Sequence, residues 1–184
     1  MAKQPRAGRV KTRLGHDIGM TAAAWWYRHR VRDLIRRIQH PGWDVVLSVT
    51  PDESATDGKS WPAHLPRVAQ GRGDLGVRMG RAIDMMPPGP ACLIGTDVPG
   101  IRRCHIARAF AALGRHDAVF GPATDGGYWL IGLKRIRPRP RDMFRDVRWS
   151  GPHALADTIA TLGPLTHATI DTLQDVDVAT DLAG

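Results

Sequence analysis

The stretch Leu93-Ile94-Gly95-Thr96-Asp97-Val98-Pro99-Gly100 decides the expected fold of this chain. The apolar run from Ala91 to Ile94 predicts a short buried strand, and Asp97 follows the point where that strand ends. Pro99 and Gly100 then stop the strand and turn the backbone. Open parallel sheets bind ligands outside the carboxyl ends of their strands, where a carboxylate could hold Mg2+ and, through it, a phosphate. The alternative is that Asp97 only caps the turn that follows.

The rest of the chain alternates between helical and extended patterns, which favours a three-layer α/β domain with a mostly parallel sheet. The spacing of apolar residues predicts helices over 21–39, 75–85, 103–113 and 152–162. Runs rich in apolar and β-branched residues predict strands over 44–50, 91–96, 118–120, 128–133 and 165–170. Residues 51–66 are polar and rich in proline, and predict an irregular loop. We expect Thr21 to be the N-cap of the first helix, with Trp25 and Trp26 near its buried face.

Length and composition limit the class of protein. With 184 residues, of which 42% are hydrophobic and 24% charged, the chain predicts a single globular domain over residues 1–184. It has no run of about 18 apolar residues, so we expect no membrane span. The start of the chain lacks the apolar core of a signal peptide, and Cys92 and Cys104 do not have metal-binding spacing. The expected location is therefore a reducing cytoplasm.

The net charge of +8 points to an anionic partner. With two Tyr and three Phe, the chain lacks the interleaved basic and aromatic residues that stack nucleic-acid bases on a strand. The basic residues concentrate near the start of the chain instead. A nucleotide-phosphate site together with a solvated basic helix face explains this more simply than nucleic-acid binding, which stays as an alternative.

Two clusters could bind the phosphates of a nucleotide. In Gly8-Arg9-Val10-Lys11-Thr12-Arg13-Leu14, an extended loop would place Arg9, Lys11 and Arg13 on one side, facing a di- or triphosphate. In the segment 70–79, three glycines lie before or within the first turn of a predicted helix, so the backbone could approach a ligand closely. The phosphate-binding residues expected there are Gln70, Gly71, Gly73 and Asp74. The simpler interpretation is a glycine-rich turn with Asp74 as the helix N-cap.

A third cluster, Gly121-Pro122-Ala123-Thr124-Asp125-Gly126-Gly127-Tyr128, lies between two predicted strands. Small residues beside Asp125 would suit the wall of a pocket. Asp-Gly is also a hairpin signal, so the segment could simply connect antiparallel neighbours.

The order of these fragments resembles one family. The fragments are Ala-Lys-x-Pro-x-x-Gly-Arg-Val-Lys-Thr-Arg-Leu, Gln-Gly-x-Gly-Asp-Leu-Gly-x-Arg-Met, Ile-Gly-Thr-Asp-x-Pro-Gly, Gly-Pro-Ala-x-Asp-Gly-Gly-Tyr-Trp-Leu-Ile-Gly-Leu and Asp-Val-Asp-x-x-x-Asp-Leu. They resemble the DUF2064 family, which comprises bacterial GT-A-like transferases also described as radical-SAM/selenodomain-associated transferases or arsenosugar-biosynthesis glycosyltransferases. The resemblance runs from Ala2 to Leu182 and implies a nucleotide-diphospho-sugar transferase-like domain. That domain is related to the nucleotidyltransferases that make molybdenum cofactors and 2-phospholactate adducts.

The resemblance also implies roles for individual residues. Asp97 would be the principal Mg2+ ligand and Asp177 the second, leaving the other positions to water and phosphate oxygens, and Mn2+ could replace Mg2+. Asp97 and Lys11 would be the catalytic residues, with Arg9, Lys11 and Arg13 on the phosphates. Asp125, Gly126, Gly127 and Tyr128 would line the acceptor or sugar pocket.

The chain departs from the family's pattern at its start. Family members place a hydrophobic strand before Ala-Lys-x-Pro, whereas here Met1 alone precedes Ala2. We therefore expect the first strand to be missing and the natural protein to begin upstream. Near the other end, Val178-Ala179 replaces the usual Thr-Pro.

The leading functional hypothesis is a Mg2+-dependent, glycosyltransferase-like enzyme with a nucleotide-activated donor and a small-molecule acceptor. A nucleotidyltransferase that releases pyrophosphate is the alternative, because Thr96 precedes a lone Asp97 where GT-A glycosyltransferases commonly carry Asp-x-Asp. If the first strand is missing, a non-catalytic nucleotide-binding module is the second alternative.

Overall fold

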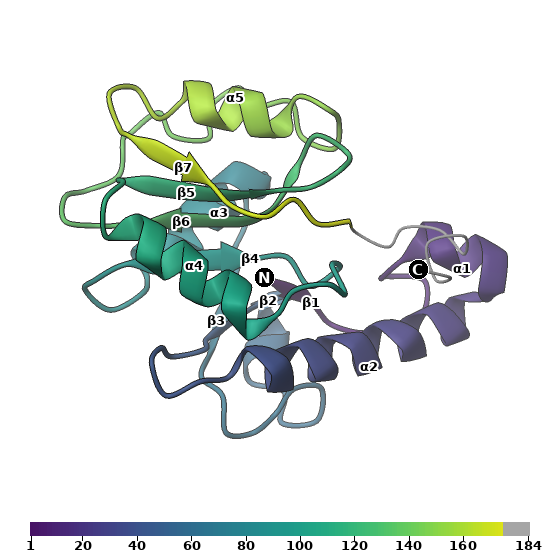
Figure 1. Ribbon diagram of the computed structural model, residues 1–184. Helices are drawn as coiled ribbons and strands as arrows, with labels where there is room; N and C mark the ends of the chain where they lie inside the picture. Colours follow the sequence, from purple (N-terminus) through teal and green to yellow (C-terminus); the bar gives the residue numbers. More distant parts are fainter. Residues whose placement is uncertain (175–184) are drawn as a thin grey trace. The chain divides into compact units, whose positions relative to one another are not determined.

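The computed structural model describes residues 1–174, which form two compact units (Figure 1). The first unit comprises Met1–Gly71 and Gly95–Arg103, and the second comprises Arg72–Ile94 and Cys104–Gln174. Three of the five strand pairs in this described part are parallel, so the fold is α/β with mostly parallel pairing, as predicted. No helix in residues 1–174 combines the length and apolar character needed to cross a bilayer. The single domain over residues 1–184 stays a prediction.

The first unit contains a parallel sheet with the order β1-β2-β3. Its elements are β1 (Ala2–Lys3), α1 (Thr12–Ile18), α2 (Met20–Ile38), β2 (Leu47–Thr50), the 3-10 helix η1 (Asp52–Ala55) and β3 (Arg67–Ala69). Ala2 pairs with Val49, and Leu47 pairs with Arg67. Strand β1 is present as two residues beside β2, and the expectation of a longer first strand upstream of Met1 stays a prediction.

Helix α2 closes the core of the first unit because one of its faces is apolar. Tyr27, Val31 and Ile35 follow one another at intervals of four residues, so they lie on one face of the helix. All three are buried in one cluster with Val49 of β2 and with Trp61. Burying a large apolar side chain contributes about 1.5–3 kcal/mol, so this face accounts for much of the stability of the unit.

Two expectations for α2 are wrong. Trp25 is 64% exposed because it precedes Tyr27 by two residues, which places it about 200° around the helix from the buried face. Trp26 is half-buried against the core, as expected. The helix begins at Met20 with Gly19 as its N-cap, so Thr21 lies within the first turn and does not cap it.

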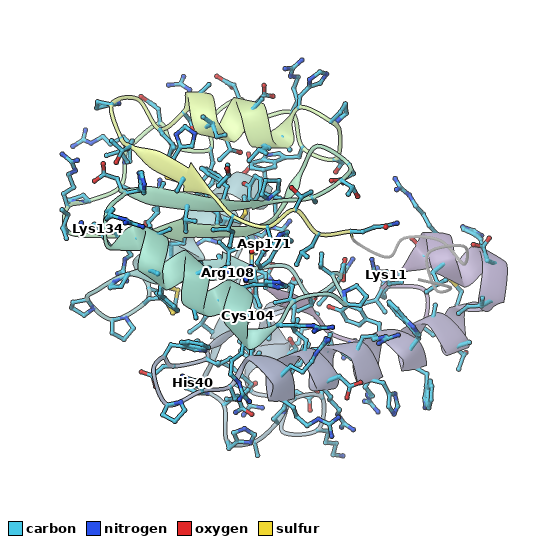
Figure 2. The ribbon with its side chains drawn as sticks, viewed as in Figure 1. Lys11, His40, Cys104, Arg108, Lys134 and Asp171 are labelled. Carbon is cyan, nitrogen blue, oxygen red and sulfur yellow. The ribbon has the colours of Figure 1, made fainter. Side chains whose placement is uncertain are left out.

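The second unit contains a four-stranded sheet with the order β4-β6-β5-β7. Its elements are β4 (Ala91–Ile94), β5 (Ala118–Pro122), β6 (Tyr128–Leu133) and β7 (His167–Thr169), with α3 (Leu75–Asp84), α4 (Arg103–Leu113) and α5 (Ala154–Ala160). Strand β6 is antiparallel to β4 and β5, and β5 is parallel to β7 (Figure 1). On α4, Arg108 forms an ion pair with Asp171, which follows β7 (Figure 2).

Gly121 of β5 allows the buried indole of Trp129 to lie against the strand backbone. A Cβ atom at Gly121 would overlap the Trp129 ring, whose Nε1 donates to the carbonyl of Asp171 at 3.0 Å. We predict that Gly121→Ala lowers the free energy of unfolding by about 1–3 kcal/mol in urea denaturation, because the ring must shift. Gly58→Ala is the control, since its Cβ would meet no atom within 4 Å. Equal losses in the two variants would contradict this account of the packing.

Candidate functional site

An ion pair between Lys11 and Asp97 forms the centre of the candidate site in the first unit. The Nζ atom of Lys11 lies 3.1 Å from Oδ2 of Asp97, and Figure 2 labels Lys11. The side chain of Lys11 is 5% exposed, whereas that of Asp97 is 48% exposed. A buried ammonium needs an anion beside it, so Asp97 serves as a counter-ion of Lys11 while part of its carboxylate still reaches solvent.

The backbone around Lys11 has an unusual conformation. Lys11 has φ 44 and ψ 48, which is left-handed, and it is the N-cap residue of α1. This backbone conformation costs a non-glycine residue about 1–3 kcal/mol, and it persists only where the surrounding structure holds the residue in place. Val10 and Leu14, which are 4% and 0% exposed, anchor the chain on either side. The fold thus maintains a strained residue whose side chain makes the ion pair, and strained residues often mark functional sites.

The expected extended loop over Gly8–Leu14 is wrong. The chain turns at residues 7–9, with Gly8 at φ 71, and α1 begins at Thr12. The alternation that would place Arg9, Lys11 and Arg13 on one side therefore does not exist. Arg9 and Arg13 are exposed, whereas the side chain of Lys11 is buried.

A chain of hydrogen bonds holds Thr96, the residue before Asp97. The amide of Lys3 donates to Oη of Tyr27 at 3.1 Å, and Oη of Tyr27 lies 2.9 Å from Oγ1 of Thr96. Thr96 in turn donates its hydroxyl proton to the carbonyl of Met1 at 3.3 Å. Because the single proton of Thr96 goes to Met1, Tyr27 is the donor to Thr96. The chain ties β1 and α2 to the segment that carries Asp97.

Tyr27 is a polar residue of the buried face of α2 that apolar spacing alone does not mark as part of the site. It is 3% exposed. Burial, with a smaller contribution from the negative charge of Asp97, raises the pKa of Tyr27 to about 12. The phenol therefore keeps its proton at neutral pH and can donate to Thr96. The sequence signal for this role is a tyrosine within a stripe of aliphatic residues. A buried phenol usually has a hydrogen-bond partner, so such a tyrosine indicates a polar contact inside the core.

The segment after Asp97 is fixed by burial and by backbone contacts. Val98 and Ile101 are 4% and 0% exposed, and Arg37 of α2 donates to the carbonyl of Pro99 at 2.7 Å. The alternative that Asp97 only caps the turn stays a prediction beside its role in a metal site.

Gln70 and Gly71 make structural contacts within the first unit. Gln70 is 4% exposed, and its Nε2 donates to the carbonyls of Ala2 and Ser48 at 3.3 and 3.0 Å. Gly71 has φ 73, and its amide donates to Oδ1 of Asp52 at 2.9 Å. Gln70 therefore ties together the three strands of the sheet, and a role for these two residues in phosphate binding stays a prediction.

Gly73 and Asp74 belong to the second unit. Asp74 caps α3, since its Oδ1 accepts from the amide of Val77 at 2.8 Å, which confirms the N-cap interpretation. Gly73 has φ 117, which favours glycine, and a Cβ there would contact Val77. The phosphate-binding role expected of Gly73 and Asp74 stays a prediction.

Asp125, Gly126 and Gly127 also lie in the second unit, in the turn between antiparallel β5 and β6, which confirms the hairpin interpretation. Oδ1 of Asp125 accepts from the amide of Gly127 at 2.8 Å. Oη of Tyr128 accepts from Oγ1 of Thr158 at 3.3 Å, and burial raises the pKa of Tyr128. Their role in an acceptor pocket stays a prediction, and Asp177 lies outside the described residues.

The fold is that of nucleotide-diphospho-sugar transferase-like proteins. A crystal structure from Desulfovibrio desulfuricans G20, described as a candidate nucleotide-diphospho-sugar transferase, matches with a TM-score of 0.82. The two sequences are 30% identical, and the match covers 96% of this chain and 80% of that chain. The family model DUF2064, described as an uncharacterised protein conserved in bacteria, matches residues 34–151. The chain therefore belongs to the DUF2064 family, as the order of its motifs predicts.

Two more distant structures share the fold. The 4-diphosphocytidyl-2C-methyl-D-erythritol synthase from Anaerococcus prevotii DSM 20548 matches at a TM-score of 0.56 and 9% identity, over 85% of this chain and 82% of that chain. A manganese complex of Rv0371c from Mycobacterium tuberculosis H37Rv matches at 0.53 and 15%, over 85% and 83% of the two chains. No curated protein matches this chain.

We predict that Tyr27→Phe lowers the free energy of unfolding by about 1–3 kcal/mol, because the amide of Lys3 loses its acceptor and the hydroxyl of Thr96 loses its donor. Hydrogen exchange of the Lys3 amide should speed up at the same time. Tyr128→Phe is the matched control, since Thr158 keeps its bond to the carbonyl of Ala154 and the Lys3 amide is not involved. Unchanged protection of the Lys3 amide in Tyr27→Phe would contradict the hydrogen-bonded chain.

Proposed function

We propose that this chain is a transferase that uses a divalent cation and a nucleotide-activated donor to modify a small-molecule acceptor. The observation that carries the proposal is the buried ammonium of Lys11, 3.1 Å from the half-exposed carboxylate of Asp97. This pair places an anion-binding group and a cation-binding group side by side. The phosphates of an activated donor need both, because they bind a divalent cation and accept hydrogen bonds from a lysine. The likeness to a candidate nucleotide-diphospho-sugar transferase supports the same conclusion.

The residues of the site fit Mg2+ or Mn2+. Carboxylate oxygens suit these hard cations, which keep several waters and bind through one or two carboxylates together with phosphate oxygens. The 48% exposure of Asp97 leaves room for those waters. Within residues 1–174 no group of three His, Cys, Asp or Glu side chains could hold a metal ion. The second ligand in this proposal is Asp177.

The chemistry assigned to the site is stabilisation of negative charge on the leaving phosphate. A bound cation supplies part of that stabilisation, as metal ions do in phosphoryl and glycosyl transfer. Lys11 donates a hydrogen bond to a phosphate oxygen, and its burial strengthens the interaction because little water screens it. The exposed Arg9 and Arg13 attract the anionic donor to this end of the chain.

The proposal also assigns the other residues that the sequence predicts for the site. Residues assigned to the donor phosphates are Gln70, Gly71, Gly73 and Asp74, and those assigned to the acceptor or sugar are Asp125, Gly126, Gly127 and Tyr128. The fixed loop conformations at these positions, which rest on side-chain caps and positive φ angles, are compatible with rigid binding loops.

Glycosyl transfer is the first form of this proposal, and the likeness to a candidate nucleotide-diphospho-sugar transferase from Desulfovibrio desulfuricans G20 supports it. In that reaction the acceptor forms a bond to the sugar carbon, and a nucleoside diphosphate leaves. Nucleotidyl transfer is the second form, favoured by Gly95-Thr96-Asp97, which has one carboxylate where Asp-x-Asp would supply two. There the acceptor attacks the α-phosphorus, and pyrophosphate leaves.

We predict that Asp97→Asn abolishes Mg2+-dependent binding of a nucleotide or nucleotide sugar, and that it also lowers the free energy of unfolding because the buried ammonium of Lys11 loses its counter-ion. A thermal-shift screen measures this, because a ligand at 100 times its dissociation constant stabilises a protein by about 2.7 kcal/mol. Product analysis then separates the two forms, since glycosyl transfer releases nucleoside diphosphate and nucleotidyl transfer releases pyrophosphate.

The matched control for this experiment is Asp33→Asn. Asp33 of α2 is 44% exposed and is paired with Arg36 at 2.6 Å, so it resembles Asp97 in exposure and in having a basic partner. It should bind ligand like the wild type. Metal-dependent binding that survives in Asp97→Asn would overturn the proposed function, and binding without turnover would favour the nucleotide-binding module.

A further inference from the structure

Helix α2 (Figure 1) carries a tryptophan in line with two arginines on its exposed face. Trp25 is 64% exposed, and His29, Arg32 and Arg36 follow it at intervals of four, three and four residues. Residues at this spacing lie on one face of a helix, and all four side chains are exposed. We call these four residues the α2 stripe, which extends about 16 Å along the helix axis.

The aromatic end of the α2 stripe is a pair of rings in contact. The ring centroids of Trp25 and His29 lie 3.9 Å apart with a tilt of 35°, and Nδ1 of His29 lies 2.9 Å from the carbonyl oxygen of Trp25. A nucleobase of any kind can stack on such a ring, because every base has a π face. The combination of basic and aromatic residues that the sequence does not place on a strand is therefore present on a helix.

Positive charge exceeds negative charge on α2. The helix carries five arginines and one acidic residue, Asp33. Asp33 forms an ion pair with Arg36 at 2.6 Å, whereas Arg32 takes part in no ion pair among residues 1–174. Arginines on an exposed face attract a ligand with several negative charges, and a guanidinium binds a phosphate through two parallel hydrogen bonds.

A groove of the first unit lies beside the basic part of the α2 stripe. His29, Arg32 and Arg36 line it from α2, and Trp61 and His64 line it from the segment after η1. Trp61 is 4% exposed and contributes an apolar part of the wall. The groove has a volume of about 540 Å3, within the range of sites that hold small organic molecules. One nucleotide of a strand therefore has room beside the arginines.

The α2 stripe suits a single strand of nucleic acid better than a lipid surface. A helix that binds in a membrane interface inserts its apolar face, but the apolar face of α2 is buried in the core of the first unit. Within the α2 stripe, Trp25 is the one apolar side chain that could enter a bilayer. A single strand instead matches both parts of the stripe, because it offers phosphates to the arginines and unpaired bases to the indole.

We propose that the α2 stripe and the groove beside it bind a single-stranded segment of RNA or DNA. Arg32 and Arg36 contact phosphates of the strand, and one base stacks on Trp25. These contacts do not involve the Lys11–Asp97 pair and need no divalent cation. The proposed strand-binding site is therefore independent of the proposed transferase activity.

The test is fluorescence anisotropy with fluorescein-labelled oligouridylate and oligothymidylate of about 12 nucleotides, a length within the site sizes of single-strand binding proteins. Buffers contain EDTA, so that binding through a divalent cation at Asp97 does not contribute. Binding should weaken as salt rises, and the logarithm of the association constant should fall by about 0.7 per log unit of salt for each phosphate contacted. Binding of either strand supports the proposal, and the ratio of the two affinities distinguishes RNA from DNA as the preferred ligand.

Two variants separate the stacking contact from the phosphate contact. Trp25→Ala should weaken binding by about 5- to 100-fold with an unchanged salt slope, whereas Trp25→Phe keeps an aromatic ring and should retain most of the affinity. Arg32→Gln should weaken binding and reduce the salt slope by about 0.7.

Arg30→Gln is the matched control, because it removes the same charge from the same helix. Arg30 precedes Arg32 by two residues, which places it about 200° around the helix, and its guanidinium lies 5.5 Å from the ring centroid of Trp26. This variant should bind like the wild type.

Four results would overturn the proposal. The first is a wild-type protein that binds neither oligonucleotide, including the case in which it binds vesicles of phosphatidylserine instead. The second is an equal loss of affinity in Arg30→Gln and Arg32→Gln, which would mean that the arginines set only a general electrostatic field. The third is unchanged affinity in Trp25→Ala. The fourth is equal affinity for an oligoglutamate of the same length, since a peptide of carboxylates has no bases to stack on Trp25.

Discussion

The burial of the Lys11 ammonium is the constraint on which the candidate site depends. A charge that is almost withdrawn from water must be compensated, and Asp97 provides that compensation from a distant part of the sequence. The consequences extend in both directions from the pair. At Lys11 the backbone adopts the left-handed conformation. At Asp97 the preceding segment is held by the hydrogen bond between the hydroxyls of Tyr27 and Thr96. A fold that maintains strain and a buried charge at one place is typical of a functional site.

The parts of the fold that could be predicted from the sequence are those with a long or strong apolar pattern. Helix α4 over 103–113 and strand β6 over 128–133 have the predicted bounds, because their apolar spacing is sustained and their ends are marked by polar residues or glycine. Helix α1 and strand β3 were not predicted, since they contain 7 and 3 residues and depend on packing rather than on local preference. Strand β2 begins at Leu47 instead of residue 44, and β4 ends at Ile94 instead of residue 96, within the usual uncertainty of strand ends.

Individual residues of the site could be predicted from the sequence, but the contacts between them could not. Asp97 and Lys11 were both identified from the sequence, yet periodicity alone could not show that they form a pair, because the approach depends on the turn at Gly8 and the left-handed backbone of Lys11. The same turn is the reason that the alternating arrangement of Arg9, Lys11 and Arg13 is wrong. Tyr27 was missed because a hydroxyl at one position of an apolar stripe does not alter the helical pattern, although it decides what holds Thr96.

The central claim is that Asp97 and Lys11 together bind a divalent cation and a phosphate group. A crystal structure of the protein with Mn2+ and pyrophosphate, with anomalous diffraction recorded at the manganese edge, tests it most directly. The account predicts an anomalous peak within bonding distance of a carboxylate oxygen of Asp97, and a phosphate oxygen about 2.8 Å from Nζ of Lys11. A manganese peak elsewhere in the molecule, with the Lys11–Asp97 ion pair unchanged at 3.1 Å, would contradict it.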